Sequence, residues 1–368
     1  MNEQKLLSSL TTLNVGGPAR NYVEATTEAE IIAAVRTADE SGDPLLIIGG
    51  GSNLLVSDDG FAGTVLKISS QGYAADSEDS CGGASVVVQA GHNWDDFVHQ
   101  TVLHAWSGLE ALSGIPGSAG ATPVQNVGAY GCEVAQTIAA VRTWDREKNA
   151  VHTFTNHELN FGYRDSLLKA ATVNGSPRYV VLTVEFQLLL GRMSAPVKYA
   201  ELARRLEVEV GKRANSLELR RTVLALRASK GMVLDPADRD TYSTGSFFTN
   251  PIVSAEIAAT LPADAPRWPV GELVKLSAAW LIEHAGFSKG FGLAGELSAA
   301  VAGGASVKHD AGAPPRASLS TKHTLAITNR GGASAQDILA VAREVRDGVV
   351  REFGITLVPE PVLVGCTL

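Results

Sequence analysis

The segment Leu112–Gly131 contains no charged side chain and is rich in glycine, serine, alanine and threonine. A glycine backbone can approach a ligand closely, adopt positive φ and point successive N–H groups into one concavity. Such a concavity binds phosphate oxygens without a lysine. The segment therefore predicts a site for a dinucleotide or a similarly large anionic cofactor. The alternative is a Gly/Pro-rich surface loop, although Val124, Val127 and Tyr130 look like anchors to a core.

A second glycine cluster, Gly49–Asn53, directly follows the apolar run Pro44–Ile48, which predicts a buried strand. A dinucleotide-binding Rossmann turn would need a third glycine where Leu54 stands, and residues 54–60 predict a strand and a turn instead of a helix. The chain also has no Gly-Lys-Ser/Thr of a P-loop. Alone the cluster is a weak signal, but together the two clusters could hold one pyrophosphate-containing cofactor from both sides.

Arg164 and Asp165 lie in the segment Gly162–Ser166, between the apolar residues Phe161 and Leu167. A guanidinium that is partly desolvated there could stabilise the charge that develops on a carboxylate or enolate. The alternative is a structural salt bridge.

Ser246 follows a glycine and precedes two phenylalanines, which places a hydroxyl at a tight turn beside an apolar wall. Phe248 excludes the Gly-x-Ser-x-Gly nucleophile elbow of hydrolases, and a turn serine that bonds its own backbone is the alternative. Glu360 stands between two prolines, so its carboxylate is held on a stiff backbone. Tyr199 and Lys230 could each reach a diphosphate or be plain surface side chains.

Composition narrows the class of protein. A chain of 368 residues is long enough for roughly two or three domains. A net charge of −8 without a basic block argues against nucleic acid and anionic membranes as partners. No apolar run reaches the ~18 residues of a membrane span, so we expect no membrane insertion. The widely spaced Cys81, Cys132 and Cys366 predict free thiols in a reducing cytoplasm. Metal-ligand spacing is not found, and His152 and His157 are interpreted as surface residues.

The elements of the first half predict an α+β arrangement, because the strands are short and are not followed regularly by helices. A capping box at Thr27 and Glu30 predicts a helix that ends at Gly42. Strands are predicted near 44–48, 86–89, 138–144 and 179–189. A helix is predicted over Trp94–Trp106, with Phe97, Val98 and Leu103 on its buried face.

Composition shifts in the second half of the chain. The charge-rich segment Glu201–Arg221 predicts helix with Ser216 as an N-cap, and we place a domain boundary near Gly211. Further helices are predicted over Lys275–His284 and Ala335–Phe353, the second followed by a strand at Ile355–Val358. Residues 288–317 are rich in Gly, Ala and Pro and predict a flexible insertion.

Taken together, the sequence resembles the bacterial UDP-N-acetylenolpyruvoylglucosamine reductases, which are flavoenzymes of peptidoglycan precursor synthesis. The resemblance covers nearly the whole chain. It begins at Thr11–Gly16 and rests on five motifs in order: Gly49–Asn53, Ser113–Gly131, Gly162–Ser166, Gly245–Pro251 and the terminal Pro359-Glu360.

The resemblance implies non-covalent FAD in a two-subdomain module of the vanillyl-alcohol-oxidase (PCMH) type, at residues 1–68 and 69–211. It also implies a C-terminal α+β substrate-binding domain at residues 212–368. NADPH would be the reductant and UDP-N-acetylglucosamine enolpyruvate the substrate, and we expect a cytoplasmic monomer without a metal.

The resemblance also implies roles for residues at matching positions. Ser246 would donate a proton, and Arg164 and Glu360 would polarise the enolpyruvyl carboxylate. Substrate contacts are implied for Tyr199, which matches a tyrosine that folds onto the substrate diphosphate, and for Lys230, Asn250 and Lys275. The implied cofactor-binding residues are Gly49, Gly50, Gly51, Ser52, Asn53, Leu54, Pro116, Gly117, Gly120, Ala121, Thr122, Asn126, Gly128, Tyr130 and Gly131.

The chain departs from the family pattern at two places. Residues 287–322 are longer than the usual short Gly-Gly-Ala stretch, which leaves the place of Gly303–Ser306 open. Val362 stands where a basic residue is usual.

Two other functions stay open at the level of sequence. An oxygen-using FAD oxidase would share the loops but commonly tethers its flavin to His or Cys. A non-enzymatic flavin- or nucleotide-binding regulator would not need Ser246, Arg164 and Glu360 together, since fold alone does not fix chemistry.

Overall fold

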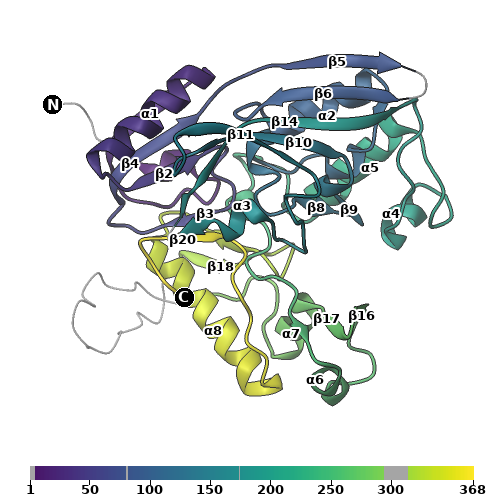
Figure 1. Ribbon diagram of the computed structural model, residues 1–368. Coiled ribbons are helices and arrows are strands. Elements are labelled where there is room, and N and C mark those ends of the chain that lie inside the picture. The colour runs from purple at the N-terminus through teal and green to yellow at the C-terminus, as the bar shows by residue number, and fades with distance from the viewer. Residues whose placement is uncertain (1–4, 80–81, 174, 294–313) are drawn as a thin grey trace. The chain divides into compact units, whose positions relative to one another are not determined.

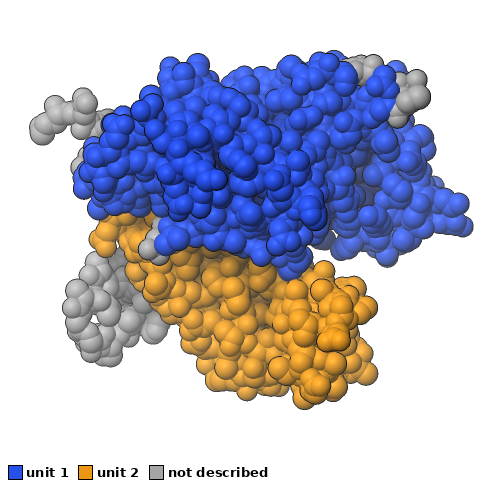
Figure 2. All heavy atoms as spheres, in the orientation of Figure 1, with its two compact units in different colours: residues 1–5, 19–51, 61–233 blue, residues 6–18, 52–60, 234–368 orange. Residues whose placement is uncertain are grey.

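The computed structural model describes residues 5–79, 82–173, 175–293 and 314–368. The chain divides into two compact units, coloured separately in Figure 2. Unit 1 comprises Met1–Lys5, Ala19–Gly51 and Phe61–Val233, and unit 2 comprises Leu6–Pro18, Ser52–Gly60 and Leu234–Leu368. Each unit has its own apolar core. In the described part of the chain, no helix has the length and apolar character needed to cross a membrane.

Unit 1 combines a small parallel sheet with a larger antiparallel one (Figure 1). Its strands are β1 (Ala19–Ala25), β2 (Leu45–Ile48), β4 (Phe61–Ile68), β5 (Tyr73–Asp79), β6 (Gly83–Gln89), β7 (Trp106–Ser107), β8 (Gly128–Ala129), β9 (Cys132–Glu133), β10 (Ile138–Asp145), β11 (Ala150–Thr155), β12 (Thr172–Val173), β13 (Ser176–Pro177) and β14 (Tyr179–Leu190). Its helices are α1 (Glu28–Ser41), α2 (Trp94–Leu103), α3 (Leu167–Ala170), α4 (Ala200–Arg205) and α5 (Ser216–Ser229), with 3-10 turns η2 (Glu110–Leu112), η3 (Ala119–Ala121) and η4 (Val134–Gln136).

The parallel sheet has the order β1-β4-β2. Its middle strand, β4, buries four consecutive residues, as a strand covered on both faces does. The expected capping box of α1 is present: the Glu30 N–H donates to Thr27 Oγ1 (3.2 Å) and the Thr27 N–H to Glu30 Oε2 (3.1 Å). Gly42 ends the helix at φ 67°. The prediction for this helix is confirmed.

The antiparallel sheet has the order β11-β10-β14-β6-β5, and β7 pairs with the far end of β14. The long strand β14 is central and alternates buried with partly exposed residues over much of its length. The predicted strands near 86–89, 138–144 and 179–189 are confirmed as parts of β6, β10 and β14.

The described residues of unit 2 form short strands and three helices. Its strands are β3 (Leu54–Val56), β15 (Ile252–Val253), β16 (Arg267–Val270), β17 (Leu273–Leu276), β18 (Ala317–Leu319), β19 (Ile327–Asn329) and β20 (Val362–Val364). The helices are α6 (Ala255–Thr260), α7 (Ala278–His284) and α8 (Ala335–Phe353), with 3-10 turns η1 (Leu7–Leu10) and η5 (Arg239–Thr241). The predicted long helix is confirmed as α8, capped by Ser334 and ended by Gly354 at φ 67°.

Several expectations in unit 1 are wrong. Helix α2 ends at Leu103, whose side chain is 60% exposed instead of buried, and Trp106 lies on a strand. The segment 201–221 is not one helix, because the chain leaves the helical conformation at Glu207, where φ is 53°. Asn215, not Ser216, caps α5, because its Oδ1 accepts the N–H groups of Leu217 and Glu218.

Unit 2 also corrects the sequence interpretation. Lys275 lies on β17, and the helix predicted from that residue begins only at Ala278. Residues 355–358 are not a strand, whereas β20 pairs in parallel with β3. Most of the predicted insertion at 288–317, including Gly303–Ser306, lies outside the described residues, as does Cys81. Cys132 and Cys366 are free thiols.

The fold class is confirmed as α+β. The predicted domain boundaries at residues 68 and 211 do not coincide with the bounds of the two compact units, and they stay a prediction.

We expect Thr27→Ala to destabilise unit 1 by about 1 kcal/mol, because it removes an N-cap acceptor. Urea unfolding monitored by circular dichroism measures this. Thr37→Ala, in the exposed middle of the same helix, is the matched control, since Thr37 Oγ1 bonds only the Ala33 carbonyl (2.9 Å). Equal effects of the two substitutions would contradict a capping role.

Candidate active site

The two glycine-rich segments meet in unit 1. A Cβ on Gly50 would lie 2.5 Å from the Cα of Gly117, closer than real Cβ contacts allow, and one on Gly49 would collide with the Ser118 side chain. Gly117 itself has φ 132°, a conformation that side chains disfavour. The contact therefore requires glycine on both segments.

Much of the glycine-rich loop is already bonded within the protein. The N–H groups of Gly120, Ala121 and Thr122 donate to carbonyls of residues 90, 118 and 119. Among the described residues, the N–H groups of Gly50, Gly51 and Gly117 have no such carbonyl partner. These last amides are the ones that an anion can use.

Two cations accompany the glycine segments, the partly buried Lys67 and the buried Arg227. The Lys67 ammonium donates to the Gly49 carbonyl, and burial lowers the pKa of Lys67. Arg227 is buried on α5, and its Cδ would lie 3.4 Å from a Cβ on Gly114.

The guanidinium of Arg227 is under-satisfied. Its Nη2 donates to the Met232 carbonyl (2.8 Å), while its Nε has no partner. No carboxylate of the described residues forms an ion pair with it, and burial lowers the pKa of Arg227. A buried charge without a counter-ion is costly, so an anionic ligand would relieve it.

Arg164 lies in a tight turn closed by the Gly162 N–H bonding the Asp165 carbonyl (3.0 Å). Its backbone has φ 54°, which is uncommon for a residue with a side chain. Asn126 supports the turn by donating to the Gly162 carbonyl (2.9 Å), and the Arg164 guanidinium donates to the Gly128 carbonyl (2.9 Å). The predicted residues Asn126, Gly128 and Arg164 are thus brought together.

Tyr199 and Lys230 each lie at the end of a helix. Tyr199 precedes α4, and its ring meets the edge of the Tyr130 ring, with centroids 5.5 Å apart. Lys230 follows α5 and pairs with Glu201 at 3.5 Å. Burial raises the pKa of the Tyr130 hydroxyl. The Tyr199 hydroxyl, the Lys230 ammonium and the partly buried Tyr130 hydroxyl thus come from three neighbouring segments.

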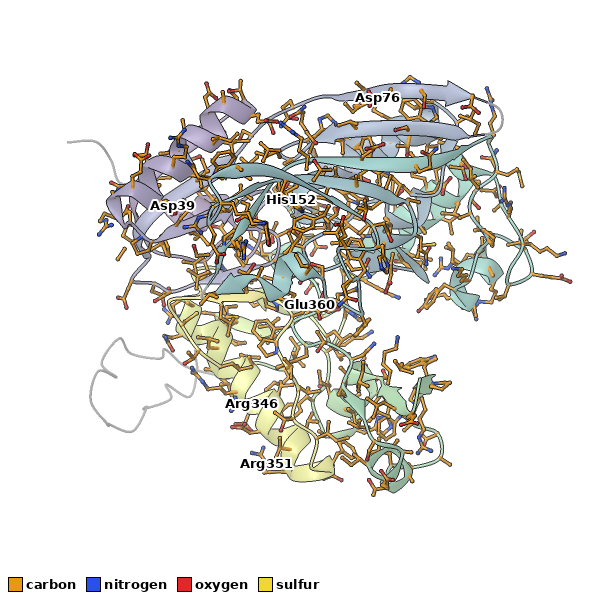
Figure 3. All side chains as sticks on the ribbon, viewed as in Figure 1. Asp39, Asp76, His152, Arg346, Arg351 and Glu360 are labelled. Atoms are coloured by element: carbon orange, nitrogen blue, oxygen red, sulfur yellow. The ribbon has the colours of Figure 1, made fainter. Side chains whose placement is uncertain are left out.

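In unit 2 the backbone joins Ser246 to Glu360. The Phe247 N–H donates to the Leu325 carbonyl (2.7 Å), and the Phe247 carbonyl accepts the Glu360 N–H (2.8 Å). Phe247 and Phe248 are fully packed in the core, which fixes the segment that carries Ser246. Glu360 lies on the segment after α8 and is labelled in Figure 3.

The Glu360 segment is bonded in turn to Asn53 and to the strand that follows the glycine cluster Gly49–Asn53. Asn53 Nδ2 donates to the Glu360 carbonyl (3.4 Å), and the Val362 N–H donates to the Asn53 carbonyl (2.9 Å). Leu54 begins β3, which pairs with β20. Ser246 and Glu360 are therefore both fixed through the main chain.

Asn250 lies four residues after Ser246 in the chain, and Lys275 lies on β17 of the small sheet β15-β17-β16. Asn250 Oδ1 accepts the N–H of Ala278 at the start of α7 (3.0 Å), so it has a structural task. Lys275 pairs with Ile252 and Trp268 across the small sheet, and its ammonium lies 6.0 Å from the Trp268 ring centre.

The sequence interpretation missed Lys67, Arg227 and Glu201. A signal for Arg227 was available, because it lies four residues after the buried Val223 and next to Leu226, on the apolar side of α5. Within the described residues no cluster of three or more acidic, histidine or cysteine side chains could hold a metal ion. His152, on β11 (Figure 3), and His157 belong to no such cluster.

Comparison with known proteins agrees with this two-part organisation. Residues 19–153 match an FAD binding domain, and residues 235–364 match the C-terminal domain of UDP-N-acetylenolpyruvoylglucosamine reductase. The reductase of that name from Cutibacterium acnes is 54% identical over 98% of this chain and 90% of its own length. The one from Streptomyces avermitilis is 52% identical over 98% and 94%.

A solved structure supports the same conclusion. The crystal structure of UDP-N-acetylenolpyruvylglucosamine reductase from Thermus caldophilus superposes with a TM-score of 0.62 at 26% identity, covering 98% of both chains. The protein therefore contains an FAD-binding domain, and the chain belongs to the UDP-N-acetylenolpyruvoylglucosamine reductase family.

Proposed function

We propose that this protein reduces UDP-N-acetylglucosamine enolpyruvate to UDP-N-acetylmuramate with NADPH, using non-covalent FAD. The proposal also has it act as a cytoplasmic monomer, with subdomains at 1–68 and 69–211 and a substrate domain at 212–368. The observation that supports this chemistry most is the set of main-chain hydrogen bonds that joins the Ser246 segment to Glu360, in a chain that belongs to this family.

The residues of unit 1 fit an FAD diphosphate. Gly50 and Gly117 leave no room for side chains at their contact, so a ligand can come close to the bare main chain. The N–H groups of Gly50, Gly51 and Gly117, which have no carbonyl partner among the described residues, would bind phosphate oxygens. The Arg227 Nε, which has no hydrogen-bond partner there either, would donate to an anionic group of the cofactor. When bound, FAD supplies the hydride-carrying chemistry between NADPH and the substrate.

The other predicted cofactor residues divide into two groups. Gly120, Ala121 and Thr122 shape the loop, because their amides are bonded internally. Ser52, Asn53, Leu54, Pro116, Tyr130 and Gly131 are proposed as further contacts, with Gly49, Asn126 and Gly128 supporting them.

Reduction of the vinyl ether at its terminal carbon leaves negative charge on the carbon that bears the carboxylate. The Arg164 guanidinium can give that carboxylate a bidentate pair of hydrogen bonds, which its fixed turn orients in advance. Glu360, when protonated, can donate a further hydrogen bond. One such donor is typically worth about 3 kcal/mol of barrier.

Ser246 completes the reaction by giving its hydroxyl proton to the charged carbon. Serine is a weak acid, so this transfer needs a strongly basic carbon and a hydroxyl that is already aligned. The packed Phe247 and its two main-chain hydrogen bonds hold the backbone next to Ser246, which supports the proposed alignment.

The remaining contacts concern the UDP moiety and its surroundings. Lys230 and Tyr199 would hold the substrate diphosphate by charge and by a hydroxyl. Asn250 can use its Nδ2, since its Oδ1 is taken by α7. Lys275 would supply a second ammonium.

Gly50→Ala should strip FAD from the protein, because the added Cβ would collide with the Gly117 backbone. The ratio of flavin absorbance to protein absorbance after gel filtration measures the loss. Gly162→Ala is the control, since its Cβ would meet only an ordinary contact at 3.5 Å from Asp165 Cβ. Full flavin retention in Gly50→Ala would contradict the proposal that Gly50, Gly51 and Gly117 bind the FAD diphosphate.

Arg227→Met should weaken FAD binding at least tenfold while leaving the apoprotein at least as stable as the wild type. Replacing a buried, unpaired charge by an apolar side chain is often neutral or stabilising. Fluorescence titration with FAD and urea unfolding of the apoprotein give the two values. Lower apoprotein stability with unchanged FAD affinity would assign Arg227 a structural role only.

Ser246→Ala should leave the bleaching of flavin absorbance by NADPH near the wild-type rate. The return of absorbance on adding the enolpyruvyl substrate should slow by about 10²-fold or more, because the general acid is gone. Anaerobic stopped-flow absorbance separates the two phases. A wild-type rate of return would remove Ser246 from the mechanism, and a return only with oxygen would indicate an oxidase.

A further inference from the structure

Lys230 is neutralised by a carboxylate of its own chain. Glu201 Oε2 lies 3.5 Å from Lys230 Nζ, and both side chains are 29% exposed. Glu201 is the only carboxylate of the described residues that pairs with either of the two cations at the end of α5, Arg227 and Lys230. The pair joins α4 to α5.

Helix α4, which carries Glu201, is weakly attached at its start. No side chain caps it, and Tyr199, the residue before it, is 39% exposed. The only ring contact of Tyr199 within the described residues is the edge of Tyr130. Leu202 and Ala203 are the buried residues of this short helix. The Glu201–Lys230 pair is thus one contact of α4, alongside these two buried side chains.

We propose that Glu201 is an internal competitor for the substrate diphosphate. Glu201 binds Lys230 when no anion is present, and an incoming diphosphate displaces the Glu201 carboxylate from the Lys230 ammonium. This inference rests on the proposed function, since it takes Lys230 to be a diphosphate contact.

The physical argument is a matter of charge. A diphosphate at Lys230 would stand within a few ångströms of the Glu201 carboxylate, and like charges at that distance repel. Binding must therefore break one ion pair before it makes another. A partly exposed pair has a modest strength, which corresponds to about a two- to fivefold weakening of anion binding.

Glu201→Gln tests this, because it keeps the shape and removes the charge. Isothermal titration with UDP should show binding two- to fivefold tighter than in the wild type. The KM for the enolpyruvyl substrate should fall by a similar factor, with kcat nearly unchanged. Glu209→Gln is the matched control: it removes the same charge from the same segment, where the Glu209 side chain is exposed and forms no hydrogen bond or ion pair with the described residues.

A double-mutant cycle with Lys230→Met isolates the pair. In the Lys230→Met background, Glu201→Gln should no longer tighten UDP binding. Unchanged or weaker UDP binding in Glu201→Gln, or equal tightening by Glu209→Gln, would overturn the inference while the proposed function stands. If the wild type neither binds UDP nor turns over the substrate, the proposed function fails and the inference fails with it.

Discussion

The close approach of Gly50 to Gly117 is the constraint on which the arrangement of unit 1 depends. The loop at Gly117 is held beside the start of α2, because the Trp94 N–H donates to the Gly117 carbonyl (3.1 Å) and the Ala119 N–H to the His92 carbonyl (2.9 Å). The segment at Gly50 leaves the end of β2 beside Lys67 of β4. Two glycine segments of the unit therefore meet backbone to backbone, and a side chain at Gly50 would push the two segments apart.

In the proposed mechanism, unit 2 has to align two weakly acidic groups, the Ser246 hydroxyl and the Glu360 carboxyl. A serine proton and a carboxyl proton are useful only if they are already in position, since neither group has a strong driving force. The structure meets this need with main-chain bonds on both sides of Phe247 instead of with flexible side chains. The pairing of β3 with β20 then joins the C-terminal segment to the same set of main-chain hydrogen bonds.

Helices could be predicted where their capping residues are close in sequence. Features that depend on residues far apart in sequence, such as strand pairing, could not. The capping boxes at Thr27 and Ser334 involve residues three apart, so sequence alone revealed α1 and α8. The strand expected at 355–358 failed because strands need a partner, and β3 pairs with residues 362–364 instead. The sequence suggested Arg164, Ser246 and Glu360 as candidates, but only the family resemblance gave them roles. The spacing from Val223 and Leu226 places Arg227 on the apolar side of α5, but its missing ion-pair partner is a tertiary property that the sequence does not show.

The central claim is that bare backbone and one buried cation hold the anionic cofactor. A crystal structure of the protein with FAD tests it most directly. The account predicts diphosphate oxygens within hydrogen-bond distance, about 3 Å, of the N–H groups of Gly50, Gly51 and Gly117, and an anionic or carbonyl oxygen of the cofactor on Arg227 Nε. A diphosphate bound elsewhere, with these amides and Arg227 left without the cofactor, would contradict it.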